Sequence, residues 1–245
     1  MNIQKVDKNR WEQAQKWEEN FWVKAQKMRA KYGKNIIWKS LALLKLKPKY
    51  RGDDWNYWWK KVFDNYAFLP NNINNGIELD CGPYTNMRLI LENTNINHLF
   101  LSDPLIKTYV KFKQTFVREM YKNNFCIIDD HPIEELPFKE NYFDLTVMIN
   151  VLDHVYDAEL CMENAIKITK KGGILIIGQD LTNENDMKNN KKLLKDIGHP
   201  IRVDHEWLDS FTKGNFKEMV YKVLTREDGR DEAHYGTYLF AGKKL

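Results

Sequence analysis

Residues 76–86 read GIELDCGPYTN, a short apolar run that leads into an acidic residue, a glycine and a proline. The run from Gly76 to Asp80 predicts a buried strand, and Gly82 allows the backbone to turn tightly before the next helix. The same order, a β-branched apolar run and then a helical pattern, recurs along the chain. We expect strands at 76–80, 98–103, 125–129, 143–150 and 173–180, and helices at 86–92, 106–120, 158–170 and 185–196. The alternation predicts an α/β fold with a doubly wound, mostly parallel sheet covered by helices on both faces.

The C-terminal part of the chain departs from this alternation. Residues 216–224 and 235–241 both have the apolar pattern of strands, and the polar stretch 226–232 separates them. A short polar connection favours an antiparallel pair, which we expect at the edge of the sheet.

The first 75 residues differ in composition from the rest. They carry a net charge of +9 within a total of +4, residues 76–245 carry −5, and seven of the eight tryptophans lie before residue 60. Apolar side chains at helical spacing predict an amphipathic helix over 8–32, and further helices are expected at 36–46 and 54–66. We therefore expect an N-terminal helical cap, residues 1–75, on a core, residues 76–245. The aromatic side chains of the cap either dock its helices on the sheet or form a lid over a bound ligand.

Composition excludes several classes of protein. With 43% hydrophobic and 29% charged residues the chain is in the globular range. Cys81, Cys126 and Cys161 are widely spaced, so we expect neither a disulfide framework nor a zinc site, and no metal. We see no secretory signal and no apolar run near the roughly 20 residues that span a bilayer. These observations predict a cytoplasmic protein, and the stretch 41–51 (LALLKLKPKYR) is compatible with a peripheral membrane contact.

Polar side chains follow the ends of successive predicted strands, where open α/β sheets bind ligands. They lie in the loop 80–86, at Asp103, in the stretch 129–138 and in the segment 150–155. A carboxylate at Asp103 can accept hydrogen bonds from both hydroxyls of a ribose. The first loop has one glycine, Gly82, and so lacks the GxGxxG of dinucleotide-binding sheets. A nicotinamide-dependent oxidoreductase is therefore disfavoured.

Taken together, the segments IELDCGPY, LSDP, IEELPFKENYFDL, NVLDHV and KGGILII resemble the class I S-adenosylmethionine-dependent methyltransferases over roughly residues 76–180. Within that class the chain is similar to the small methyltransferases found with bacterial capsule and lipopolysaccharide biosynthesis, many of which begin with a WExAQxxExxFW-like helix, as Trp11–Trp22 does here. The resemblance implies a seven-stranded Rossmann-like sheet, an antiparallel seventh strand and S-adenosylmethionine as cofactor.

The resemblance also implies a set of cofactor-binding residues. Glu78 would lie near the methionine moiety, Gly82 would let the chain pass close to the cofactor, and Asp103 would bind the ribose. The remaining positions flank the adenine or the reactive end of the cofactor: Ile133, Glu134, Asp130, Asn150 and Val151. Two positions depart from the family's usual glycines, Asp80 and Tyr84. Asp80 either binds the cofactor's ammonium group or weakens cofactor binding.

Candidate catalytic residues follow from the same comparison. His154, with Asp153 beside it in sequence, is the first candidate for a general base, and the alternative is that His154 only holds its loop in place. His199 and His205 are rivals in the segment 198–207, where Arg202 could bind a phosphate bidentately. We also predict that Tyr84 contacts the substrate.

The basic cap and the site together suggest the substrate class. Scattered lysines commonly form a solvated helix face. The alternative is that the basic cap holds a small anionic or sugar acceptor, such as a nucleotide-linked sugar. A hydroxyl, phosphate or phosphoramidate oxygen of this acceptor would receive the methyl group. Nucleic acid is disfavoured because no RNA-binding module is recognisable. Two rival functions are a catalytically silent S-adenosylmethionine-binding module and a methyltransferase for another small molecule. Nothing in the sequence indicates an oligomeric state.

Overall fold

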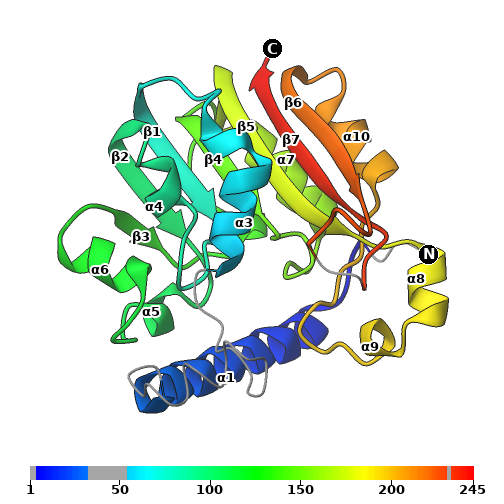
Figure 1. Ribbon diagram of the computed structural model, residues 1–245. Helices are drawn as coiled ribbons and strands as arrows, with labels where there is room; N and C mark the ends of the chain where they lie inside the picture. Colours follow the sequence, from blue (N-terminus) through cyan, green and yellow to red (C-terminus); the bar gives the residue numbers. More distant parts are fainter. Residues whose placement is uncertain (1–3, 33–53, 231–232) are drawn as a thin grey trace.

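The computed structural model describes residues 4–32, 54–230 and 233–245, and these form a single seven-stranded sheet flanked by helices (Figure 1). The strand order is β3-β2-β1-β4-β5-β7-β6. The strands are β1 (Asn72–Leu79), β2 (Asn95–Ser102), β3 (Ile127–Asp129), β4 (Phe143–Ile149), β5 (Thr169–Leu181), β6 (Phe216–Thr225) and β7 (Gly236–Lys244). β7 pairs antiparallel with β5 and β6, and the other pairs are parallel. The predicted Rossmann-like methyltransferase sheet, with its antiparallel C-terminal pair, is confirmed.

Each face of the sheet has its own apolar core because side chains alternate along the strands. On β4, Leu145 and Val147 belong to the core beneath α3 (Asp54–Val62), α4 (Met87–Ile90), α5 (Ile106–Tyr109) and α6 (Phe116–Lys122). Met148 faces the opposite core, beneath α7 (Ala158–Ile168) and α10 (His205–Thr212). Figure 1 shows α3 and α4 on one side of the sheet and α7 on the other. Two covered faces explain the continuous apolar runs of the central strands.

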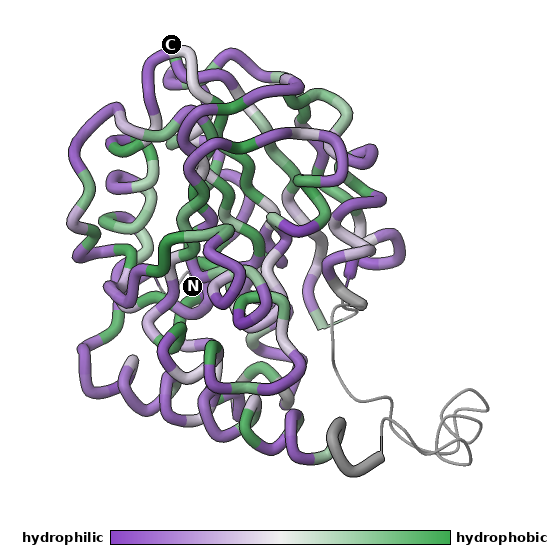
Figure 2. Tube along the Cα trace, turned by 90° about the vertical axis from the view of Figure 1, so that its left-hand side faces the viewer, coloured by the Kyte–Doolittle hydropathy of each residue, from purple (hydrophilic) through white to green (hydrophobic). Residues whose placement is uncertain are grey.

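The predicted N-terminal helix is present as α1 (Lys8–Tyr32), which lies across the carboxyl ends of the parallel strands (Figure 1). In Figure 2 this helix forms the largely hydrophilic coil along the lower edge of the molecule. Its beginning is anchored by the backbone, because Val6 N donates to Tyr156 O at 2.9 Å and Ala158 N donates to Gln4 O at 2.9 Å. Ala14 and Trp22 supply its buried contacts. The strand ends thus have a cover that is attached to the loop before α7.

Two predicted helices are each divided in the structure, so both predictions of one continuous helix were wrong. The expected helix 106–120 is interrupted after α5, because Thr115 has extended backbone and its side chain caps α6 by accepting from Arg118 N at 3.4 Å. The expected helix 185–196 divides at Asn190 into α8 (Glu184–Asn189) and α9 (Lys191–Leu194). The Thr115 side chain competes with the helix for a nearby backbone group, and periodicity does not reveal this competition.

The N-terminal region contributes to the core as well as to the cover. The predicted helix 54–66 corresponds to α3 and the 3-10 turn Asp64–Tyr66, and Trp59, Phe63 and Tyr66 are fully buried against the sheet. β1 begins at Asn72, four residues before the boundary expected at residue 76. The predicted helix 36–46 and the basic stretch 41–51 lie outside the described residues. No helix in the described ranges is long and apolar enough to cross a membrane.

Candidate functional site

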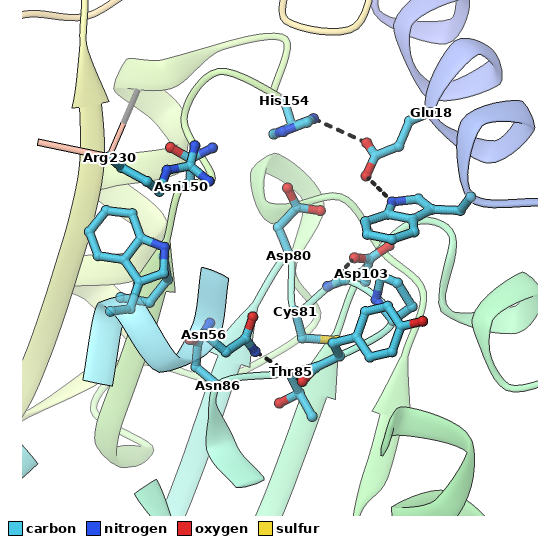
Figure 3. Close-up of a pocket in the computed structure, with 16 residues that line it drawn as sticks. Glu18, Asn56, Asp80, Cys81, Thr85, Asn86, Asp103, Asn150, His154 and Arg230 are labelled. Atoms are coloured by element: carbon cyan, nitrogen blue, oxygen red, sulfur yellow. Dashed lines mark hydrogen bonds and ion pairs between the residues drawn. The ribbon is translucent and has the colours of Figure 1, made fainter. Parts of the chain in front are cut away.

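A cavity of about 90 Å³ lies where the carboxyl ends of β1, β2 and β4 meet α1 and α3 (Figure 3). Six of the predicted site residues line it: Asp80, Gly82, Tyr84, Asp103, Asn150 and His154. Residues that the sequence analysis did not assign to a site complete the wall, among them Glu18, Trp22, Asn56, Trp59 and Arg230. The carboxyl edge of the sheet therefore brings together residues from six separate parts of the chain.

The loop after β1 shapes one wall through unusual backbone conformations. Asp80 and Gly82 both have left-handed backbone, with φ of 51° and 58°. Asp tolerates this region better than most residues, whereas glycine adopts it freely. A Cβ on Gly82 would meet no atom within 4 Å, so the space beside this backbone is open to a ligand.

Asp103 joins this loop to the end of β2. Its Oδ2 accepts from Gly82 N at 2.9 Å, and its Oδ1 accepts from Leu105 N at 2.7 Å. Burial, together with the Glu18 carboxylate, raises the pKa of Asp103 to about 7 despite these two bonds. Burial and the Asp103 carboxylate also raise the pKa of Asp80 well above its ordinary value. Both carboxyl groups therefore hold a proton more readily than an exposed aspartate does, and Asp80 points into the cavity in Figure 3.

Glu78 lies below the cavity rather than in its wall. Its carboxylate accepts from Asn86 N at 2.9 Å, from Met87 N at 3.1 Å and from the Thr85 hydroxyl. It is 1% exposed, and burial raises its pKa. Glu78 thus holds the loop onto the start of α4.

His154 faces Glu18 of α1 across the cavity, and the sequence analysis assigned no function to Glu18. His154 Nδ1 lies 3.0 Å from Glu18 Oε2, and Trp22 Nε1 donates to Glu18 Oε1 at 3.1 Å. Burial alone would lower the pKa of His154, but the Glu18 and Asp153 carboxylates raise it to about 10. Burial likewise opposes ionisation of Glu18, but the charge of His154 lowers the pKa of Glu18 to about 2. The i, i+4 spacing of Glu18 and Trp22 was visible in the sequence, but the partner 136 positions later was not.

Behind His154 the structure places Asp153 and His199, both outside the cavity wall. The His154 and His199 rings are 4.6 Å apart, and His199 Nε2 lies 3.9 Å from Asp153 Oδ2. Burial opposes ionisation of Asp153, but the neighbouring histidines lower its pKa. Two of the three candidate catalytic histidines therefore lie together. The third, His205, is the first residue of α10, and its Nδ1 forms a hydrogen bond of 2.9 Å with the Tyr235 hydroxyl.

The remaining predicted site residues are engaged elsewhere. Glu134 Oε1 accepts from Tyr156 N at 2.7 Å and from Asp157 N at 2.9 Å, which ties it to the start of α7. Asp130 forms a surface ion pair with Lys107. Ile133 and Val151 are buried in the core beneath α7, and Arg202 is buried with its guanidinium 3.3 Å from Asp196.

Arg230 enters the cavity from the β6–β7 connection, which the sequence analysis treated as a turn. Arg230 Nε donates to Asp180 Oδ2 at 2.9 Å, and the guanidinium lies 5.6 Å from the Trp59 ring. On the same side, Asn56 Nδ2 donates to Tyr84 O at 3.0 Å. These contacts give the cavity a polar and aromatic wall opposite Asp103.

Comparisons with known proteins agree with the fold. The family model described as "Methyltransferase domain" matches residues 101–177. No curated protein matches the chain. The N-methyltransferase NodS of Bradyrhizobium japonicum has a similar fold, with a TM-score of 0.57 at 15% identity over 79% of this chain and 99% of that one. Its complex with S-adenosyl-L-homocysteine has a TM-score of 0.51 at 16% identity over 71% and 79%. A chain from the complex of the Haloferax volcanii methyltransferase activator Trm112 with a proposed methyltransferase has a TM-score of 0.58 at 16% identity over 78% and 91%.

Proposed function

We propose that the chain, as an S-adenosylmethionine-dependent methyltransferase, transfers a methyl group to an oxygen of a sugar or of a phosphate or phosphoramidate group in a surface-polysaccharide precursor. The observation that carries the choice of acceptor is the wall of the cavity opposite Asp103, which is built from amide, guanidinium and aromatic side chains. Such a wall suits a polyhydroxylated or anionic molecule better than an apolar one. The N-terminal helix, with its resemblance to capsule-associated enzymes, supports the polysaccharide setting.

The residues of the cavity fit the ribose and methionine parts of the cofactor. The open space at Gly82 allows close approach, and the lone pairs that Asp103 does not use can accept from ribose hydroxyls. Glu18 supplies negative charge towards a cation, and a bound cation would favour ionisation of Asp80. When bound, the cofactor supplies a methyl group on a positively charged sulfur. We assign Gly82 and Asp103 to the ribose, and Asp80 and Asn150 to the methionine end.

The cavity is smaller than the whole cofactor requires. Its volume of about 90 Å³ is well below the roughly 300–1,000 Å³ of typical ligand pockets. Trp22 and Tyr84, whose rings are 5.7 Å apart, occupy the space between α1 and the first loop. We therefore propose that α1 and Tyr84 move outwards to admit the cofactor and then close over it. The closed helix would align the acceptor and exclude water, which are the main requirements of methyl transfer.

The acceptor would contact the residues that form the wall of the cavity opposite Asp103. Asn56 and Asn150 offer amide groups, Arg230 offers a cation for a phosphate, and Trp59 offers a flat apolar face for a sugar ring. His154 is the predicted contact of the reacting hydroxyl. We place the reaction in the cytoplasm, where Cys81, Cys126 and Cys161, all buried and free, stay reduced.

The test is the release of S-adenosylhomocysteine from S-adenosylmethionine in the presence of candidate acceptors. We expect turnover with nucleotide-linked sugars and none with apolar amines or phenols. Replacement of Arg230 by Lys should raise the KM of a phosphate-bearing acceptor and leave cofactor affinity unchanged, since Lys keeps the charge over Asp180. Turnover with amines alone would overturn the choice of an oxygen acceptor, and cofactor binding without turnover on any acceptor would favour the silent module.

A further inference from the structure

We propose that Asp153, His154 and His199 bind a divalent transition-metal ion beside the cavity. One ligand atom from each of these residues lies within 4.8 Å of the others. Two imidazole nitrogens and one carboxylate oxygen are the ligand set that zinc and neighbouring transition metals accept, with coordination positions left open.

The spacing is close to that of a loaded site. His199 Nε2 and Asp153 Oδ2 are 3.9 Å apart, and the two rings are 4.6 Å apart in an edge-to-face arrangement. With metal–ligand bonds of about 2.0–2.2 Å, ligand atoms of one ion lie about 3–4 Å apart. Shifts of about 1 Å or less, within the reach of side-chain rotation, would complete the site.

His199 is held as a metal ligand requires, because its Nδ1 forms a hydrogen bond of 2.7 Å with Asp196 Oδ2. A carboxylate on Nδ1 orients the ring, raises its basicity and leaves Nε2 free for the ion. His154 Nδ1 lies 3.0 Å from Glu18 Oε2, so a carboxylate also lies beside the second ring. Two carboxylates, one from α1 and one from the segment after α9, thus lie beside Nδ1 of the two rings.

Asp153 is similarly oriented. Its Oδ1 accepts from Gln179 Nε2 at 3.1 Å and its Oδ2 accepts from Asn150 Nδ2 at 3.4 Å. The residue is 8% exposed. These bonds fix the carboxylate towards the histidines while keeping lone pairs available.

The local charge favours a divalent cation. The carboxylates of Glu18, Asp153 and Asp196 converge on the two rings, and Arg202, 3.3 Å from Asp196, is their cationic neighbour. Once both imidazoles are deprotonated to coordinate the ion, this group carries a net charge of −2, which a divalent ion would balance. The side chain of His199 is 28% exposed and provides access from solvent.

An ion at this place would also reach the reaction site, because His154 lines the cavity. Its open positions could hold the acceptor hydroxyl and favour loss of the hydroxyl proton, a contact the imidazole would otherwise make. This catalytic role rests on the proposed function, whereas ion binding itself does not.

Binding is tested on the full chain by dialysis against ZnCl2 followed by elemental analysis and by calorimetric titration with Zn²⁺. We expect one equivalent per chain. His199→Ala and Asp153→Asn should each weaken binding at least tenfold, and Asp196→Asn, which removes the carboxylate behind His199, should weaken it about 10–100-fold. His98→Ala serves as the matched control, because His98 is exposed on β2. Substituted Co²⁺ should give a visible absorption band in the wild type and in His98→Ala.

Circular dichroism and thermal unfolding of each variant show whether it is folded. If a variant of a ligand residue fails to fold, Asp196→Asn still tests the proposal, because it keeps all three ligands. Absence of stoichiometric zinc in the wild type would overturn the proposal, as would unchanged binding in both His199→Ala and Asp196→Asn. The catalytic role has a separate readout. Removal of the ion should lower turnover without changing the affinity for S-adenosylhomocysteine, and unchanged turnover would discard the role.

Discussion

Ionisation of Asp103 should make the affinity for the cofactor depend on pH. Its pKa is raised to about 7 by burial and by Glu18, and the carboxyl group of Asp80 shares its environment. Ribose hydroxyls donate to the ionised form, so cofactor binding should lower this pKa and release a proton. We expect the affinity for S-adenosylhomocysteine to rise about tenfold between pH 6 and pH 8. Calorimetry in buffers of different ionisation enthalpy measures both the affinity and the released proton.

Two variants separate the contributions to this effect. Asp103→Asn should weaken binding and remove the pH dependence, because the amide does not titrate. Glu18→Gln should move the midpoint of the pH dependence to lower pH, because it removes the carboxylate that helps to raise the pKa of Asp103 and keeps the shape of the side chain. Affinity that stays constant from pH 6 to pH 8 in the wild type would contradict a raised pKa at Asp103.

Among single residues, the sequence identified several of those that line the cavity and left others unassigned. Asp80, Gly82, Asp103 and Asn150 were predicted because each follows a strand, and parallel strands end at one edge. Glu18 and Arg230 could not be placed in this way. Glu18 lies on a helix outside the repeating pattern, and Arg230 lies in the connection between β6 and β7.

At the scale of elements, α3 is held on the sheet by a close contact at a glycine. A Cβ on Gly178 of β5 would lie 2.7 Å from the Trp59 ring of α3, and Trp59 is 2% exposed. We expect Gly178→Ala to displace α3 and lower the free energy of unfolding by about 1–3 kcal/mol. Urea unfolding of the purified variant measures this change.

A double-mutant cycle with Trp59→Leu tests whether the cause is this contact. The smaller side chain should remove most of the penalty of Gly178→Ala, giving a favourable coupling between the two positions. Independent, additive effects would show that the alanine acts through β5 alone. Both Trp59 variants should also bind the acceptor less well, since Trp59 lines the cavity.

The elements themselves were predicted with different success. All seven strands were found. The buried strands leave continuous apolar runs in the sequence, and the more exposed β6 mixes apolar and polar residues before a polar connection. The helices 106–120 and 185–196 were predicted as continuous, and both are divided by residues with extended backbone, Thr115 and Asn190. Capping by a side chain depends on local hydrogen bonds, which the spacing of apolar residues does not show.

At the scale of the whole molecule, the buried carboxyl group of Asp103 should make the free energy of unfolding depend on pH. Asp103 binds a proton in the folded state up to about pH 7, whereas in the unfolded chain it is ionised above its ordinary value of 3.8. The folded state therefore holds the extra proton between these two values, and its stability falls as pH rises through 7. We expect a loss of about 1 kcal/mol between pH 6 and pH 8 from this group.

Comparison with Asp103→Asn isolates this contribution, because the other titrating groups are common to both proteins. The difference in free energy of unfolding between variant and wild type should increase from pH 6 to pH 8 in chemical denaturation. Saturating S-adenosylhomocysteine should reduce the pH dependence of the wild type. A difference that does not vary with pH would rule out Asp103 as its source.

The sequence by itself determined the sheet, its parallel strands with an antiparallel C-terminal pair, and the edge at which several of the cavity-lining polar side chains meet. These properties follow from local patterns of apolar residues and from general rules of strand connection. Only the tertiary structure decided which distant side chains meet: Glu18 with His154, His154 with His199, and Arg230 with Trp59. It also showed that Glu134 and Arg202 are engaged outside the cavity. The reason is that such contacts depend on how α1, the loop after β4 and the β6–β7 connection pack together, and no pattern within any one segment encodes its distant partner.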